Sequence, residues 1–374
     1  MPSFLAICPK GLSEVLEKEI QSLGIESTQK IAAGVFFDTN WEGCYKVNLH
    51  SRIASRVVKP VLDFPAYNGD DIYNNILQHD FTKYISPDQT LKVDAAVKEC
   101  AIHDQRFLAM KVKDAIVDQF RDKFGRRPDV DNQRPALRIV VQGRKNEFHV
   151  SVDTSGDALY MRGYRLEAGD APLKENLAAA LLAMAEWDKQ SPVIDPLCGS
   201  GTILIEAAMM AMNIAPGSLR NRFGFMSLQG FEKDKWENLV EEAIAQEKPE
   251  LPFLFYGSDI DRKVLKMAKD NARRAGVDHV IEFKPSPVAT YEPSVPAGLV
   301  VTNPPYGVRL GDEDNVRDIY KDLSYTLKNR FKGWNAWILS GNKDLITDLK
   351  LKATRRQFTY NGPIECRFLK YEMF

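Results

Sequence analysis

A glycine-containing turn between a short apolar strand and an apolar helix is the feature that most constrains the fold. The strand ends at Asp195, Gly199 and Gly201 form the turn, and we expect a helix over residues 203–212. Glycines at such a turn let the backbone approach a ligand closely, and the new helix N-terminus offers unpaired N–H groups. The same turn also occurs without a ligand, so the glycines alone leave both interpretations open.

Two familiar nucleotide motifs do not match this turn. It lacks the Lys-Ser or Lys-Thr pair of a P-loop, and Leu204 stands where a nicotinamide fingerprint carries its third glycine. The sequence of the turn therefore argues against a loop that binds nucleoside triphosphates, and it weakens the case for a nicotinamide-binding loop.

Strands and helices alternate from about residue 170 onward. Such alternation predicts an α/β domain with a mostly parallel, doubly wound sheet covered by helices on both faces. The expected strands are 193–195, 253–258, 280–283, 299–302 and 336–340, with a helix at 173–187 and a closing antiparallel hairpin at 355–360 and 366–371.

The first half of the chain has a different pattern, in which short strands and amphipathic helices predict an α+β architecture. The expected strands are 3–8, 34–38, 57–64, 91–97, 136–142 and 147–153, and the main helices are 12–23, 41–53 and 107–120.

A second acidic strand end follows the glycine turn. Asp259 directly follows the strand 253–258, where a carboxylate can accept the hydrogens of both ribose hydroxyls. We assign Asp259 to a ribose and Asp261 to capping the next helix, with two helix caps as the alternative. The insertion at 214–250, which carries Arg220 and Arg222, is a lid, an RNA contact or plain packing.

The motif Asn303-Pro304-Pro305-Tyr306 follows the apolar strand 299–302. The prolines fix the backbone and remove N–H donors, so the Asn303 amide oxygen and the Pro304 carbonyl can together accept two hydrogens of an –NH2 group. Tyr306 offers a flat face for a base. The alternative is a proline-rich turn that only ends a strand.

Other chemistries find little support. The five cysteines form no CxxC pair, the five histidines are dispersed, and no Ser/His/Asp set or HExxH motif occurs, so we expect no metal. A net charge of −1 does not by itself indicate nucleic-acid binding. We expect no signal peptide, no membrane segment and a cytoplasmic location.

Together these motifs resemble the class I S-adenosylmethionine-dependent methyltransferases. The resemblance makes 195–202 motif I, Asp259 the acid of motif II, 303–306 motif IV of the amino-methylating branch, and 174–177 motif X. It implies S-adenosylmethionine as cofactor, with S-adenosylhomocysteine as product, and catalytic roles for Asn303, Pro304, Pro305 and Tyr306. The residues it implies for the cofactor are Lys174, Asn176, Asp195, Pro196, Cys198, Gly199, Ser200, Gly201, Thr202, Asp259 and Ile260.

One departure from that family lies after the third strand, where an acid usually holds the adenine amino group. Residues 283–291 contain no carboxylate, so Ser286, Thr290 or the backbone would have to substitute, and the contact stays unassigned.

The segments RGYR, APLKENLAAALL, DPLCGSGT, GSDID and NPPYGVRLG resemble, more closely, the bacterial THUMP-domain methyltransferases that make N2-methylguanine in 23S ribosomal RNA. The resemblance implies a Rossmann-like catalytic domain, a THUMP RNA-binding domain and a role in rRNA processing by methylation. It divides the chain into a ferredoxin-like part at 1–44, a THUMP domain at 45–155, a linker at 156–172 and the catalytic domain at 173–374.

Candidate RNA contacts are less specific. Arg126, Arg127, Arg144 and Lys145 add positive charge to the THUMP region, but interleaved aspartates make a solvated face an equal alternative. Arg162, Tyr164 and Arg165 in the linker either position the RNA or pack the two halves together.

Three rival functions remain open. A DNA N6-adenine methyltransferase uses the same four residues, but usually carries a DNA-reading domain after the catalytic one, and here 68 residues follow Tyr306. The others are a THUMP RNA-binding module without catalysis and, more distantly, a protein-glutamine methyltransferase. The oligomeric state stays open.

Overall fold

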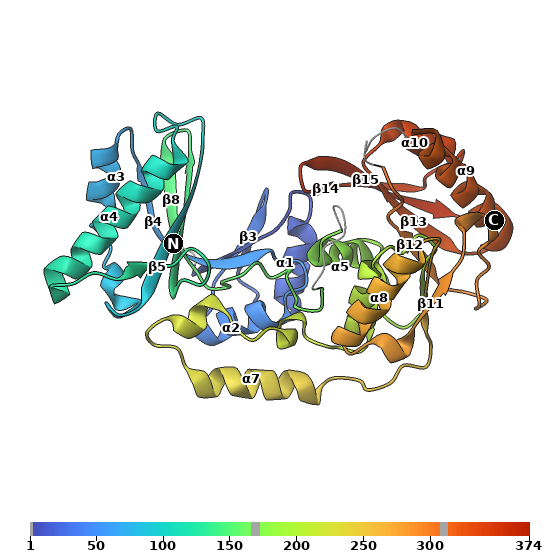
Figure 1. Ribbon diagram of the computed structural model, residues 1–374, viewed down its shortest axis with the longest axis horizontal. Helices are drawn as coiled ribbons and strands as arrows, with labels where there is room; N and C mark the ends of the chain where they lie inside the picture. The colour runs from blue at the N-terminus through green and yellow to red at the C-terminus, as the bar shows by residue number, and fades with distance from the viewer. Residues whose placement is uncertain (1–2, 166–172, 307–312) are drawn as a thin grey trace.

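The structure is a computed structural model that describes residues 3–165, 173–306 and 313–374. An eight-stranded sheet forms the N-terminal half and a seven-stranded sheet the C-terminal half, and the two halves lie side by side along the long axis of the molecule (Figure 1).

The N-terminal sheet has the order β2-β3-β1-β4-β8-β7-β5-β6. Its elements are β1 (Phe4–Ile7), α1 (Ser13–Ser22), β2 (Thr28–Ile31), β3 (Gly34–Phe37), α2 (Trp41–His50), β4 (Arg56–Pro65), α3 (Gly69–Ile76), β5 (Thr90–Lys98), α4 (Gln105–Phe124), β6 (Asp129–Val130), β7 (Leu137–Arg144) and β8 (Glu147–Asp153). The sequence did not predict β2, whose residues are mostly exposed and lack the alternation of a half-buried strand.

Strand β4 makes this sheet continuous. It pairs with β1 through residues 56–58 and with β8 through residues 58–65. The division expected after residue 44 falls inside α2, whose Cys44, Tyr45 and Val47 are all buried. A boundary there would split one helix and its buried face, so the structure does not divide the chain at that point.

The C-terminal sheet has the order β11-β10-β9-β12-β13-β15-β14, with parallel pairing from β11 to β13 and antiparallel pairing of β15 with both its neighbours. This is the doubly wound sheet with a terminal hairpin that the sequence predicted. Its elements are α5 (Glu175–Met184), β9 (Val193–Asp195), α6 (Thr202–Ala211), α7 (Lys233–Ala245), β10 (Phe255–Asp259), α8 (Arg262–Arg274), β11 (Ile281–Pro285), β12 (Leu299–Thr302), α9 (Glu313–Arg330), β13 (Asn335–Ser340), α10 (Lys343–Asp348), β14 (Arg355–Asn361) and β15 (Ile364–Glu372).

Alternate residues of the central strands face opposite sides of this sheet. Val193 and Val301 pack with α5, α6 and α8, whereas Ile194 and Val300 pack with α9. Burial on both faces explains why these strands read as continuous apolar runs in the sequence.

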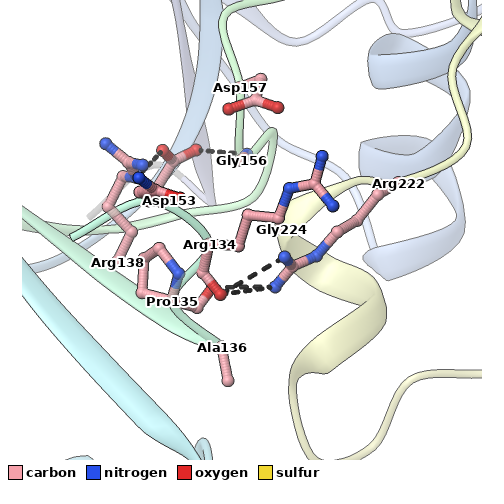
Figure 2. A pocket seen from close by; sticks show the side chains of 10 residues that line it. Arg134, Pro135, Ala136, Arg138, Asp153, Gly156, Asp157, Arg222 and Gly224 are labelled. Atoms are coloured by element: carbon pink, nitrogen blue, oxygen red, sulfur yellow. Dashed lines mark hydrogen bonds and ion pairs between the residues drawn. The ribbon is translucent and has the colours of Figure 1, made fainter. Parts of the chain in front are cut away.

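The insertion at 214–250 packs against the N-terminal half. The Arg220 guanidinium donates to the carbonyls of Ser155, Asp157 and Ala158. The Arg222 guanidinium donates to those of Arg134 and Pro135 (Figure 2). The sequence left three roles open for this segment: a lid, an RNA contact or packing. The contacts of the described residues support packing.

Within the described part of the chain, none of the helices combines the length and the apolar character needed to cross a membrane. The same residues contain no cluster of three His, Cys, Asp or Glu side chains placed to hold a metal ion.

Candidate active site

The end of β9 and the end of β12 lie next to each other in the parallel sheet. Ile194 pairs with Val300, and the Thr302 hydroxyl donates a hydrogen bond of 2.6 Å to Asp195 Oδ1. Because Asn303 directly follows Thr302, it leaves the sheet at the same edge as the glycine turn. The two predicted motifs therefore share one edge of the domain, where ligands of doubly wound sheets bind.

The glycine turn is held from two sides. Its Cys198 N–H donates to the Ser258 carbonyl at 2.8 Å, and the Asn271 amide donates to the Ser200 carbonyl at 3.2 Å. Gly201 has φ +80°, and a Cβ there would lie 2.9 Å from the Phe283 ring. Only glycine fits this position, both for its backbone angle and for the contact with Phe283.

Asp259 and Asp261 have separate tasks in the structure. Asp259 accepts from the Gly199 N–H at 3.1 Å and from the Asp261 N–H at 2.9 Å, while Asp261 caps α8 through the Lys263 N–H at 2.7 Å. The next residue after Asp259, Ile260, is 73% exposed. In a nucleoside site, such an exposed apolar side chain can cover the adenine ring, and the neighbouring carboxylate can bind the ribose hydroxyls.

Burial raises the pKa of Asp195 to about 7, although hydrogen bonds from Thr302 and the Leu197 N–H act in the opposite direction. This carboxyl is therefore partly protonated near neutral pH.

The amide oxygen of Asn303 is buried and has no hydrogen-bond partner among the described residues. Pro304 is buried and Pro305 exposed. The Tyr306 hydroxyl accepts a hydrogen bond of 2.8 Å from Asn361, at the tip of the β14–β15 hairpin. A buried acceptor that lacks a partner calls for an explanation, and a ligand hydrogen would supply one.

The two side chains expected from motif X lie at the start of α5. Asn176 is fully buried and donates to the Ile53 carbonyl and the Ser55 hydroxyl, so it ties α5 to the loop before β4. The Lys174 ammonium lies 4.6 Å from the centre of the Tyr160 ring. The hydroxyls of Ser286 and Thr290, considered for the adenine, both donate to the Pro287 carbonyl.

Arg162 and Tyr164 of the linker lie inside the protein, so of the two roles that the sequence left open for them, the structure supports packing and not contact with RNA. Both are 1% exposed, and both bond to the carboxylate of Glu206 in α6, at 3.5 and 3.2 Å. Arg165 pairs with Glu175 at 3.5 Å and also bonds to the Thr202 hydroxyl. The contact with Thr202 supports the start of α6. Arg162 also donates to the Arg52 carbonyl, before β4, and this bond joins the two halves.

The basic residues of the THUMP region form two separate groups. Arg126 and Arg127 follow the C-terminal end of α4, whereas Arg144 and Lys145 lie by the turn whose Asn146 bonds to Ala101, just before α4 begins. Twenty helical residues span about 30 Å. All four residues are exposed, and Arg126 pairs with Asp88 at 2.7 Å. The structure therefore does not bring these four together.

Sequence reasoning missed three supporting side chains: Thr302, Glu206 and Asn361. Glu206 carries the clearest signal, because it is the one charge in the apolar helix α6. A lone carboxylate in such a helix requires a buried partner, which Arg162 provides.

Models of three families match the chain. An RMKL-like methyltransferase domain of the UPF0020 family matches residues 162–370, an RlmL ferredoxin-like domain matches 3–58, and a THUMP domain matches 66–153. These matches confirm the resemblance drawn from the motifs.

Similar proteins extend the likeness over the whole chain. A "Putative RNA methyltransferase slr0064" of Synechocystis sp. is 39% identical over 99% of this chain and 97% of its own length. A "Ribosomal RNA large subunit methyltransferase K/L" of Methylococcus capsulatus is 41% identical over 99% of this chain, which spans 51% of that relative. The solved structure of SMU.472, "a putative methyltransferase complexed with SAH", is 30% identical and superimposes with a TM-score of 0.91 over 100% of this chain and 98% of that one.

Proposed function

Since the chain belongs to the family of RMKL-like methyltransferases, we propose that it methylates the exocyclic amino group of a base in structured RNA, and that the base is a guanine of 23S rRNA methylated at N2. Its cofactor is S-adenosylmethionine. An enzyme with this substrate would act in the cytoplasm. The chain spans about half the length of its K/L relatives. We choose 23S rRNA as the substrate because those relatives are named as methyltransferases of the large-subunit ribosomal RNA.

One observation carries the choice of an amino group. The buried oxygen of Asn303 has no partner among the described residues, and Asn303 leaves the sheet beside Asp195 and the glycine turn. An –NH2 group would satisfy this oxygen with one hydrogen and the Pro304 carbonyl with the other. With both hydrogens held, the nitrogen lone pair is left to point away from them, and orientation of the reacting atoms supplies much of the rate.

The residues at the glycine turn fit the cofactor. Asp259 would hold the ribose, Ile260 would cover the adenine ring, and Gly199 and Gly201 would allow close approach of the backbone. The bound cofactor supplies a methyl group made electrophilic by its positively charged sulfur. Pro196, Cys198, Ser200 and Thr202 stay proposed cofactor residues on the motif match. The match also gives Lys174 and Asn176, but both line a cavity with Lys10 and Tyr360, and we assign them to that cavity instead.

The other side chains of the site handle the base. Tyr306, fixed by Asn361, would stack on it, and a duplex base would first have to leave its stack. Neither acceptor needs to be a strong base, because the methylated nitrogen carries an extra proton that it readily gives up to water.

Arg126, Arg127, Arg144 and Lys145 are proposed phosphate contacts. Because the two pairs lie at opposite ends of α4, their contributions to binding should add. Alanine substitution of either pair should weaken RNA binding and flatten its salt dependence, and the fourfold variant should lose the sum of both effects. Binding that stays equally tight and salt-dependent in the fourfold variant would remove these residues from the interface.

Nucleoside mass spectrometry of rRNA, tRNA and DNA from cells with and without the gene tests the function. Loss of N2-methylguanosine from 23S rRNA, restored by the wild-type gene but not by an Asn303→Ala copy, is the expected result. Unchanged RNA together with loss of N6-methyladenine from DNA would overturn the proposal in favour of the DNA enzyme.

A further inference from the structure

A cavity of about 500 Å³ lies where three separate parts of the chain meet. Its walls come from the loops that follow β1 and precede β4, from the start of α5, and from the tip of the β14–β15 hairpin. The volume falls in the range of about 300–1,000 Å³ that is usual for ligand pockets. Two of the three walls lie outside the segments expected to hold the cofactor.

The cavity adjoins the site proposed for the target base. Asn361 lines the cavity and also donates the 2.8 Å hydrogen bond to the Tyr306 hydroxyl. A group in the cavity and a base on Tyr306 would therefore lie on two sides of one side chain. Two groups that contact the same side chain are close enough to belong to neighbouring nucleotides of one RNA strand.

The lining combines the three chemistries that a nucleotide requires. Lys10 and Lys174 bring two positive charges, and Tyr360 brings an aromatic ring. Asn176 is fully buried, donates through its amide nitrogen to Ser55 and Ile53, and has an amide oxygen with no partner among the described residues. Phosphates bind to lysines, bases stack on aromatic rings, and base amino groups donate to amide oxygens.

We propose that this cavity holds a second nucleotide of the RNA, next to the one that is methylated. Its phosphate lies at Lys10 and Lys174, its base stacks on Tyr360, and a base amino group donates to Asn176. The inference rests on the proposed function and adds to it a residue set that selects the sequence beside the target. That nucleotide would contact the ferredoxin-like part, the hairpin and α5 at once.

The test uses 23S rRNA purified from cells that lack the gene, with Lys10→Ala and Tyr360→Ala as the variants. Lys332→Ala and Tyr325→Ala are matched controls, because both residues are exposed and Lys332 lies between α9 and β13, at the opposite edge of the sheet. We expect kcat/KM for rRNA methylation to fall about tenfold in each variant and to stay unchanged in the controls. The dissociation constant for S-adenosylhomocysteine, measured by calorimetry, should stay within twofold of wild type throughout.

Three results would overturn the inference, and they are distinguishable. Variants that methylate rRNA as fast as wild type would show that the cavity holds no RNA. Variants that bind S-adenosylhomocysteine tenfold more weakly would assign the cavity to the amino-acid end of the cofactor. A wild-type protein that methylates no RNA would instead overturn the proposed function, and this inference with it.

Discussion

Thr302 and Asp195, the last residues of two neighbouring parallel strands, share a buried hydrogen bond of 2.6 Å. Asp195 is 2% exposed and Thr302 is not exposed at all. This contact joins the strand that leads into the glycine turn to the strand that leads into Asn303, so the two halves of the proposed chemistry have a common support.

Asp195 should make the stability of the protein depend on pH. Its pKa is about 7 in the folded protein and near 4 when the chain is unfolded, so between these values the folded state binds the extra proton. Stability should therefore fall as pH rises from 4 to 7, by roughly 1.4 kcal/mol for each unit of pKa difference, and then level off. Asp195→Asn keeps the oxygen that accepts from Thr302 and Leu197 and should lack this fall. Urea unfolding of both proteins across this pH range measures the difference, and parallel curves would contradict the raised pKa.

Asn303→Ala should abolish turnover and spare the cofactor. The variant removes one of two proposed acceptors, and misorientation of the amino group should cost about 10²-fold or more in methyl transfer to rRNA. The dissociation constant for S-adenosylmethionine should not change. Stability should not fall, because the described residues offer the amide oxygen no partner to lose. Asn329→Ala, an exposed position on α9, is the control, and full activity in Asn303→Ala would refute the assigned role.

Asp259 and Asp261 should separate cofactor binding from helix capping. Asp259→Ala removes the acceptor for the Gly199 and Asp261 N–H groups together with the proposed ribose contact, so calorimetry should show at least about tenfold weaker binding of S-adenosylmethionine. Asp261→Ala removes only the cap of α8 and should cost about 1 kcal/mol of stability at unchanged affinity. Equal affinities in the two variants would return Asp259 to the role of a plain structural cap.

Glu206 and Arg162 should behave as one buried unit. Glu206→Ala leaves the Arg162 guanidinium without its carboxylate and should destabilise the protein by about 3–5 kcal/mol. The double variant Arg162→Met, Glu206→Leu replaces both charges with apolar groups and should be less destabilised than the single variant. Urea unfolding of the single and double variants gives the coupling, and additive losses would show that the pair does not act as a unit.

Local patterns in the sequence determined the catalytic half of the molecule. Burial on both faces makes each central strand an apolar run, and a sharp strand-to-helix turn requires glycine at Gly201, so the positions of the strands and motifs could be predicted from short windows. The order of the strands in the sheet could not. The same locality located the Asn303 motif at a strand end. It could not reveal β2, because the residues of this strand are mostly exposed and show no alternation of polar and apolar side chains.

Contacts between distant segments were decided by the tertiary structure alone. The sequence pattern predicts a helix that begins at residue 41, but it does not show that the buried face of this helix belongs to the ferredoxin-like unit. The segment RGYR carries the same charge whether it contacts RNA or, as in the structure, Glu206. Arg126 and Lys145 are close in sequence, yet Arg126 follows the C-terminal end of α4 and Lys145 lies near its N-terminal end. Periodicity reports which side of its own element a residue occupies, whereas its partners depend on how elements far apart in the chain pack together.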